Sequence, residues 1–238
     1  SASARPVLVT GAGGFLGGYV VRELRAHGIP VLASGRDAQA LARVAAPEET
    51  LVSSLAGLPG AVRPVDAIVH CAALSSPWGR RSDFAAANVE GTAAAVSFAE
   101  KSGARRFVFV SSPSVYAAAR DRIGIREDDV DPGNRLNDYI RSKLAAEELL
   151  REAQRAGRIH ELVIVRPRGL IGAGDPSLVP RLIAVHRRIG VPLFDDGRNL
   201  IDVTAVENAA SALRLALRAG DPAGGVYNIS NGDPRPFR

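Results

Sequence analysis

Two side chains with complementary proton chemistry stand four residues apart in the segment DYIRSK. On a helix, Tyr139 and Lys143 share one face. A phenol has a pKa near 10, so it exchanges protons at neutral pH only when a nearby cation stabilises its phenolate. Lys143 can supply that charge. Lys101 is the only other lysine among the 30 basic residues, so a lysine beside Tyr139 is less easily dismissed. The alternative is an ordinary exposed helix lysine, which is the more frequent meaning of an isolated Y-x-x-x-K match.

Hydroxyl groups follow a predicted strand in the segment RFVFVSSPSVY. The strand prediction covers 106–112, which puts Ser111 and Ser112 at its carboxyl end. In an open α/β sheet, ligands bind outside the carboxyl ends of the strands. A hydroxyl there can hydrogen-bond a substrate oxygen while Tyr139 exchanges its proton. Taken alone, such a serine pair is more often a cap or a turn.

Glycines crowd the segment TGAGGFLG, between a predicted strand at 6–10 and a predicted helix at 15–28. Gly11, Gly14 and Gly17 follow a G-x-x-G-x-x-G spacing. Such a turn lets a pyrophosphate approach bare backbone at the helix N-terminus, where unpaired N–H groups favour an anion. The segment does not end in Gly-Lys-Ser/Thr, which argues against a nucleoside triphosphate site. The pattern predicts a dinucleotide site, with a merely structural turn as the alternative.

The end of the predicted strand at 30–34 bears on the choice of cofactor. Arg36 comes first there and Asp37 follows. A carboxylate would accept a hydrogen bond from the ribose 2′-hydroxyl of NAD, whereas an arginine would pair with the 2′-phosphate of NADP. The order favours NADP(H), with NAD(H) as the alternative. The competing interpretation is that Arg36 is solvated and Asp37 caps the next helix.

Strands and helices alternate along the chain and place these residues at strand ends and helix starts. This order predicts an α/β fold, a doubly wound parallel sheet of the Rossmann type with a small, incomplete C-terminal substrate region. Residues 1–165 are expected to form the dinucleotide-binding core. Residues 166–238 are expected to form a mixed region that closes the sheet and contributes to the substrate site. The chain lacks Met and stops just after a strand and turn, so we expect it to continue.

Composition narrows the classes of function. A chain of 238 residues with 46% hydrophobic content can bury one substantial core. The basic residues are scattered and only 5% of residues are aromatic, which argues against a nucleic-acid partner. One cysteine, Cys71, excludes an internal disulfide and is interpreted as packing, and no apolar run approaches a membrane span. The histidines lack ligand spacing, so no metal is expected. We predict a soluble cytoplasmic protein.

Taken in order, these segments resemble the extended short-chain dehydrogenase/reductase superfamily, in the branch of NAD(P)-dependent epimerases, 3β-hydroxysteroid dehydrogenases and related reductases. The resemblance runs from TGAGGFLG to GVYNIS and covers nearly the whole chain. Its motifs are TGxxGxxG, DxxxHxAA as DAIVHCAA, NVxGT as NVEGT, SSPSVY, YIRSK, and RPxxVYGPGD as RPRGLIGAGD. As a set they are far more specific than any one of them.

The resemblance implies a role for each matching position. The implied catalytic residues are Ser112, Tyr139, Lys143 and the supporting Asn88. The implied cofactor contacts, with Arg36 added from the argument above, are Gly11, Gly14, Phe15, Leu16, Gly17, Arg36, Ala72, Ala73, Ser111, Tyr139, Lys143 and Pro167. Two departures matter. Ser54-Leu55 replaces the Asp-Leu that meets the adenine, and GLIGAG lacks the tyrosine of VYG.

The resemblance also implies a reaction. Lys143 lowers the pKa of Tyr139, Ser112 orients the carbonyl, and a hydride passes between the nicotinamide and an apolar alcohol or ketone of the 3β-hydroxysteroid or β-keto acid type. An NAD-dependent nucleotide-sugar epimerase or dehydratase is the alternative, since the arginines of VPRLIAVHRRIG could hold a diphosphate. A non-catalytic dinucleotide-binding regulator is the third, which the intact proton relay disfavours. Dimerisation through the Tyr139 helix and the Ala-rich helix before it is implied by resemblance alone.

Overall fold

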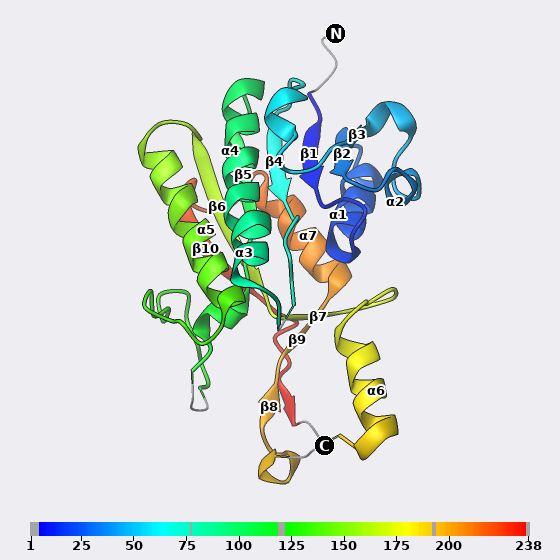
Figure 1. Ribbon diagram of the computed structural model, residues 1–238, viewed down its shortest axis with the longest axis vertical. Helices are drawn as coiled ribbons and strands as arrows, with labels where there is room; N and C mark the ends of the chain where they lie inside the picture. Colours follow the sequence, from blue (N-terminus) through cyan, green and yellow to red (C-terminus); the bar gives the residue numbers. More distant parts are fainter. Residues whose placement is uncertain (1–4, 77, 119–121, 192–193, 237–238) are drawn as a thin grey trace.

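A seven-stranded sheet forms the centre of the molecule (Figure 1). The computed structural model describes residues 5–76, 78–118, 122–191 and 194–236. Across the sheet the strand order is β10-β6-β5-β4-β1-β2-β3, and neighbouring strands are parallel. The strands are β1 (Val7–Thr10), β2 (Val31–Gly35), β3 (Thr50–Val52), β4 (Ala67–His70), β5 (Arg106–Val110), β6 (Glu161–Pro167) and β10 (Ala223–Ile229). From β1 the chain adds β2 and β3 on one side, and it then returns to add β4 and the later strands on the other side of β1. Doubly wound sheets bind ligands at this switch point, between β1 and β4.

Both faces of the sheet are covered, and the strands show it in their side chains. In β1, Val7 and Val9 pack into one core cluster and Leu8 into the other. Successive side chains of a strand point to opposite faces, so a strand buried on both sides is apolar throughout rather than alternating. This is why short continuous apolar runs could be predicted as central strands.

Helices form the two outer layers. The core cluster on one face includes side chains of α1 (Phe15–Ala26), α2 (Ala38–Ala42) and α7 (Val206–Ala216), and the cluster on the other includes side chains of α4 (Gly91–Ser102) and α5 (Asp138–Arg155). The predicted helix at 15–28 ends at Ala26, with Gly28 two residues beyond at a φ of +68°. The predicted α/β doubly wound fold is therefore what this chain forms.

One helix changes its winding in the middle. α3 (Arg81–Phe84) runs into a π-helical turn, Ala85–Glu90, which leads directly into α4. The residues at both joints keep right-handed helical backbone angles, so 81–102 is one continuous helix with a wider turn inside it. Such π turns are rare and often occur at functional sites. This one carries Asn88.

A smaller group of elements extends beyond the carboxyl ends of the central strands, in the lower part of Figure 1. β7 (Gly169–Ile171) pairs in parallel with β9 (Val203–Ala205), and β8 (Leu200–Ile201) pairs antiparallel with β11 (Arg235–Pro236). α6 (Leu178–Ile189) stands beside them and has no buried residue. The sequence did not predict these strand pairs, because their strands have only two or three residues each and pair across long stretches of chain. It did not predict α6 either.

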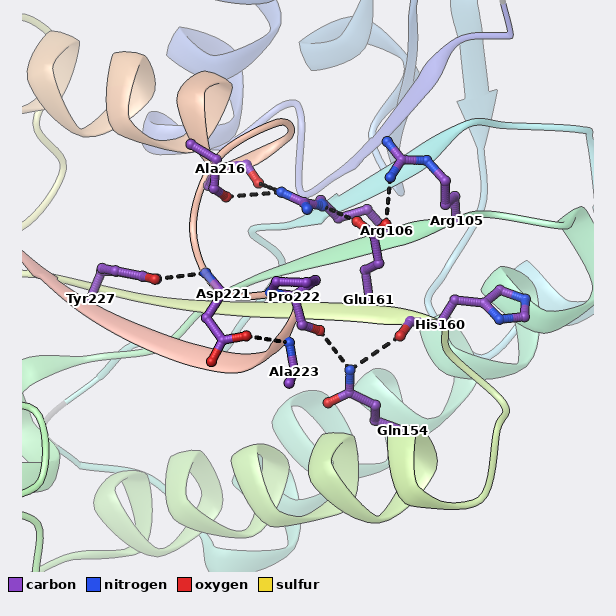
Figure 2. Close-up of polar contacts among 11 residues, drawn as sticks. Arg105, Arg106, Gln154, His160, Glu161, Ala216, Asp221, Pro222, Ala223 and Tyr227 are labelled. Atoms are coloured by element: carbon purple, nitrogen blue, oxygen red, sulfur yellow. Dashed lines mark hydrogen bonds and ion pairs between the residues drawn. The ribbon is translucent and has the colours of Figure 1, made fainter.

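An arginine fastens the end of α7 to the sheet (Figure 2). Arg106, in β5, donates to the carboxylate of Glu161 and to the carbonyl oxygens of Ala216 and Ala219, at 2.9 and 2.8 Å. Arg105 binds the other oxygen of the same carboxylate from the surface. The last carbonyl groups of a helix have no partner within it, so this arginine satisfies groups that would otherwise lack a donor. No helix in the described part of the chain is long and apolar enough to cross a membrane.

Candidate active site

The glycine-rich segment makes a tight turn between β1 and α1. Gly11 has a φ of +66°, in the left-handed region that favours glycine. A Cβ on Gly17 would lie 2.1 Å from the carbonyl oxygen of Gly11, and one on Gly11 would lie 2.9 Å from the Cα of Ala72. Gly14 caps α1 without a side-chain hydrogen bond, so the first N–H groups of the helix stay available for a phosphate. The geometry requires glycine at 11 and 17.

The other predicted cofactor contacts in this region surround that turn. Phe15 is half-buried with its ring edge-on to Tyr19 at 5.7 Å, and Leu16 packs against the core. Ala72 follows β4, and its N–H donates to the hydroxyl of Thr10 at 3.2 Å. Ala73 comes next and is exposed. The end of β4 is thereby tied to the residue before Gly11.

Arg36 is exposed beyond the end of β2. The carboxylate of Asp37 accepts from the N–H groups of Gln39 and Ala40, at 2.9 and 3.1 Å, and caps α2. The capping role foreseen for Asp37 is therefore present. That carboxylate already holds two donors, whereas the guanidinium of Arg36 lies in solvent beside the strand end.

Tyr139 and Lys143 lie in the first two turns of α5, as the spacing predicts. The side chain of Asn137 caps this helix by accepting from the N–H of Ile140 at 2.8 Å. Lys143 is buried, donates to the carbonyl oxygen of Val110 at 2.7 Å, and lies 4.3 Å from the ring centroid of Phe109. Burial lowers the pKa of Lys143 to about 8. Tyr139 is half-buried, with its ring 6.2 Å from that of Phe84.

The two serines after β5 have different surroundings. The hydroxyl of Ser112 accepts from the N–H of Ser114 at 3.2 Å, and their hydroxyls lie 2.7 Å apart. Ser111 instead directs its hydroxyl inward and donates to the buried carboxylate of Glu147 at 2.5 Å. Ser112 thus lies at the strand end, two residues after the carbonyl that Lys143 holds. The hydroxyl of Ser111 is instead held in the interior by its hydrogen bond to Glu147.

Asn88 clamps the segment after β4 to α5. Its amide nitrogen donates to the carbonyl oxygen of Leu74 at 3.1 Å and to the hydroxyl of Ser142 at 2.8 Å. Its amide oxygen accepts from the N–H of Leu74 at 2.7 Å. Because Ser142 adjoins Lys143, Asn88 fixes the helix turn that carries the proposed catalytic pair. Pro167, the last implied contact, is buried at the end of β6.

A histidine that sequence reasoning left unassigned links the glycine turn to Asn88. The nitrogens of His70 lie 2.7 Å from the Thr10 hydroxyl (Nδ1) and 3.1 Å from the Thr92 hydroxyl (Nε2). Thr92 donates its proton to the carbonyl oxygen of Asn88 at 2.7 Å, so it accepts from Nε2–H. Thr10 then donates to Nδ1. Burial lowers the pKa of His70 to about 3, so the ring is neutral.

A buried ion pair was also missed. Glu147 and Arg166 have side chains that are 1% and 2% exposed, and two nitrogens of Arg166 donate to the two carboxylate oxygens at 2.9 and 2.6 Å. A third nitrogen of Arg166 donates to the hydroxyl of Tyr116 at 2.6 Å. The available signal was the position of Glu147, one turn after Lys143. A glutamate on a helix is usually solvated, so it was not singled out.

One cavity lies beside α5, and a second is formed by residues that precede this helix in the chain. One of about 830 Å³ is lined by residues that include Ser142, Glu147 and Arg166, and one of about 720 Å³ by residues between Val115 and Leu136. Neither is lined by the glycine turn. Among the described residues, no group of His, Cys, Asp or Glu side chains is placed to hold a metal ion. Burial raises the pKa of the Cys71 thiol to about 12, which agrees with a packing role.

Comparison with known proteins identifies the group to which this arrangement belongs. The model of a family described as the NAD dependent epimerase/dehydratase family matches residues 7–230. The chain belongs to this family. It is 37% identical over 245 residues to the uncharacterized protein YbjS of Escherichia coli (strain K12), covering 98% of this chain and 72% of that protein. It is 36% identical over 248 residues to a 2-alkyl-3-oxoalkanoate reductase of Stenotrophomonas maltophilia (strain K279a), with 98% and 72% covered.

Solved structures agree with the fold. MoeE5 in complex with UDP-glucose and NAD superposes with a TM-score of 0.80 at 30% identity, covering 98% of this chain and 78% of that one. The predictions of an extended short-chain dehydrogenase/reductase and of an NAD(P)-dependent enzyme are confirmed. The chain spans about 72% of the length of the two curated relatives named above.

Proposed function

We propose that the protein reduces an apolar ketone of the β-keto acid or 3-oxosteroid type, with NADPH as the reductant. The observation that carries the proposal is the buried ammonium group of Lys143, held at the end of β5 one turn after Tyr139. The name of one relative, 2-alkyl-3-oxoalkanoate reductase, supports the substrate class. Residues 1–165 would hold the dinucleotide, and residues 166–238 would contribute to the substrate site.

The proposed chemistry follows from these side chains. When bound, the dinucleotide supplies the hydride that adds to the carbonyl carbon. Tyr139 gives its phenolic proton to the carbonyl oxygen, and the hydroxyl of Ser112 orients that oxygen. The positive charge of Lys143 stabilises the phenolate that remains, which later takes a proton from water. Asn88 acts through Ser142 by fixing the helix turn.

Exposed apolar side chains support an apolar substrate. Large apolar residues are exposed on the segments that follow β4 and β5 and on α6, and all of these leave the sheet at its carboxyl end. They include Trp78, Ile123, Leu136, Leu182 and Ile183. An apolar ligand seated there would remove such surface from water, which is the main favourable term for its binding. Arg36, free in solvent at the end of β2, supports NADPH through its charge.

The test is the oxidation of NADPH by the full chain with medium- and long-chain β-keto acids, beside the same assay with NADH. Tyr139→Phe is expected to lower kcat by about 10²- to 10⁴-fold without changing the thermal midpoint. Arg36→Ala is expected to raise the KM for NADPH about 10-fold and leave that for NADH unchanged. Arg43→Ala, another exposed arginine on the same segment, is the matched control. Equal use of both cofactors, unchanged by Arg36→Ala, would contradict the cofactor assignment.

A nucleotide-sugar epimerase is the second candidate. It is favoured by the similarity to MoeE5, whose structure holds UDP-glucose and NAD, and by Arg181, Arg187 and Arg188 on α6. Conversion of UDP-glucose without net consumption of cofactor would establish it and exclude the reductase. A non-catalytic regulator would bind dinucleotide without turnover of either substrate class, with Tyr139→Phe having no effect on any measured output.

A further inference from the structure

The buried carboxylate of Glu147 lies in the same helix as the proposed proton relay. Lys143 and Glu147 are one turn apart on the buried face of α5. Lys143 donates to the carbonyl oxygen of Val110, and Glu147 accepts from the hydroxyl of Ser111, the next residue along. Two successive turns of α5 thus hold two successive residues at the carboxyl end of β5. Glu147 therefore lies one helical turn after Lys143 and contacts the residue that follows the lysine's partner, Val110.

The carboxylate is kept in its charged form by its partners. Burial alone would raise the pKa of Glu147, but hydrogen bonds and charge from Arg166, then the hydrogen bond from Ser111 and the charge of Arg151, hold it below its ordinary value. Arg166 is itself fixed by donating to the hydroxyl of Tyr116 and to the carbonyl oxygen of Glu127, at 2.6 and 2.9 Å. The contacts therefore favour the charged form of the carboxylate and hold it in place.

Lys143 has few other charges to compensate its burial. The titratable groups around it are Tyr139 and Glu147 on its own helix, and His70 and Cys71 at the end of β4. His70 is neutral and the Cys71 thiol is protonated at neutral pH. Glu147 is the one ionised carboxylate among these groups.

We propose that Glu147, fixed by Arg166 and Ser111, is a positioning residue that keeps the ammonium group of Lys143 charged and anchored at the end of β5. Its role in catalysis rests on the proposed function, because the charge on Lys143 matters to the reaction through Tyr139. Its effect on Lys143 itself does not depend on any substrate.

The two-lysine composition of this chain allows a direct measurement. Protein labelled with ¹³C at the lysine Cε gives two lysine signals, from Lys101 and Lys143, and Lys101→Arg assigns them. The titration midpoint of Lys143 is followed by NMR from pH 6 to pH 10 in the full chain without substrate. Glu147→Gln is expected to lower this midpoint by about one pH unit, the size typical of losing a neighbouring opposite charge.

Two further variants make the result decisive. Glu148→Gln is the matched control, since Glu148 is the next residue but is exposed and pairs with Arg155. In this variant the titration midpoint of Lys143 should equal that of the wild type. The double variant Glu147→Gln with Arg166→Gln removes both buried charges, which avoids an unpaired arginine if the single variant does not fold. It should lower the midpoint by less than the single variant does, because the positive charge of Arg166 is removed together with the negative charge of Glu147. An unchanged Lys143 midpoint in either folded variant overturns the proposal.

Activity then separates this proposal from the function on which it rests. In carbonyl reduction, the alkaline limb of the kcat profile should move to lower pH with Glu147→Gln by the same amount as the NMR midpoint, while Glu148→Gln leaves it in place. A purely structural role would lower the thermal midpoint without moving this limb. A wild-type protein that reduces no ketone would overturn the proposed function, while the NMR midpoints would still decide the effect of Glu147 on Lys143.

Discussion

His70 is the residue whose protonation should couple most directly to stability. Burial lowers its pKa from 6.5 to about 3, so below pH 6.5 the unfolded chain takes up a proton that the folded chain refuses. Stability therefore falls as the pH drops through this window. Between pH 7 and pH 5 this effect should lower the free energy of unfolding by about 2 kcal/mol.

The measurement is urea unfolding of the wild type and His70→Asn at both pH values. Asn keeps a side-chain acceptor in roughly the place of Nδ1 but does not titrate. The wild type should lose about 2 kcal/mol more than the variant between pH 7 and pH 5. Equal losses would contradict the neutral histidine between Thr10 and Thr92. An imidazole proton signal on Nε2 would independently confirm the tautomer.

Among single residues, the sequence predicted those whose chemistry depends on local spacing. Tyr139 and Lys143 are four apart on one helix, and Gly11 and Gly17 belong to one turn, so their relations could be read from a short segment. The partners of Ser111 and Asn88 could not, because Glu147 and Ser142 lie 36 and 54 residues away. Such contacts exist only once the sheet and both helix layers are assembled.

At the scale of elements, Arg105 and Arg106 make a natural comparison, because both bind Glu161. The side chain of Arg106 is 7% exposed and also holds two carbonyl groups at the end of α7, whereas that of Arg105 is 52% exposed. Arg106→Met should lower the free energy of unfolding by about 3 kcal/mol, since it leaves those carbonyl groups without donors. Arg105→Met should cost less than about 1 kcal/mol. Denaturant unfolding of both variants measures the difference, and equal losses would show that α7 does not depend on Arg106.

The predicted elements differ from the structure mainly in where they end. β4 stops at His70, and the strand expected at 106–112 stops at Val110. The residues just beyond make contacts of the site. The N–H of Ala72 donates to Thr10, and the hydroxyl of Ser111 donates to Glu147 while its N–H still bonds to Val165 of the neighbouring strand. After β4 the residues Cys71, Ala72 and Ala73 also remain apolar. Composition therefore cannot locate the end of the strand.

For the whole molecule, burial predicts two very different levels of local stability. Every residue of β4 and β5 is buried, whereas no residue of α6 is. Amides of β4 and β5 should exchange with solvent only through near-global unfolding, and those of α6 through local opening at little cost. Hydrogen exchange read by mass spectrometry should show α6 fully exchanged at least about 100-fold sooner. Protection of α6 equal to that of β5 would mean that another surface covers it in solution.

The π turn at Ala85–Glu90 limits how the length of its helix can change during evolution. Phe84, before the turn, packs against Tyr139, while Thr92, after it, bonds to His70. Deleting one alanine between them would let α3 and α4 merge into a regular α-helix with nearly the same angular phase, because the wider turn takes up about one residue more than an α turn. Deleting a second residue would shift the phase by about 100°, and one of the two contacts would then face the wrong way. The segment can therefore lose one residue but no more, unlike a surface loop, where insertions and deletions are tolerated.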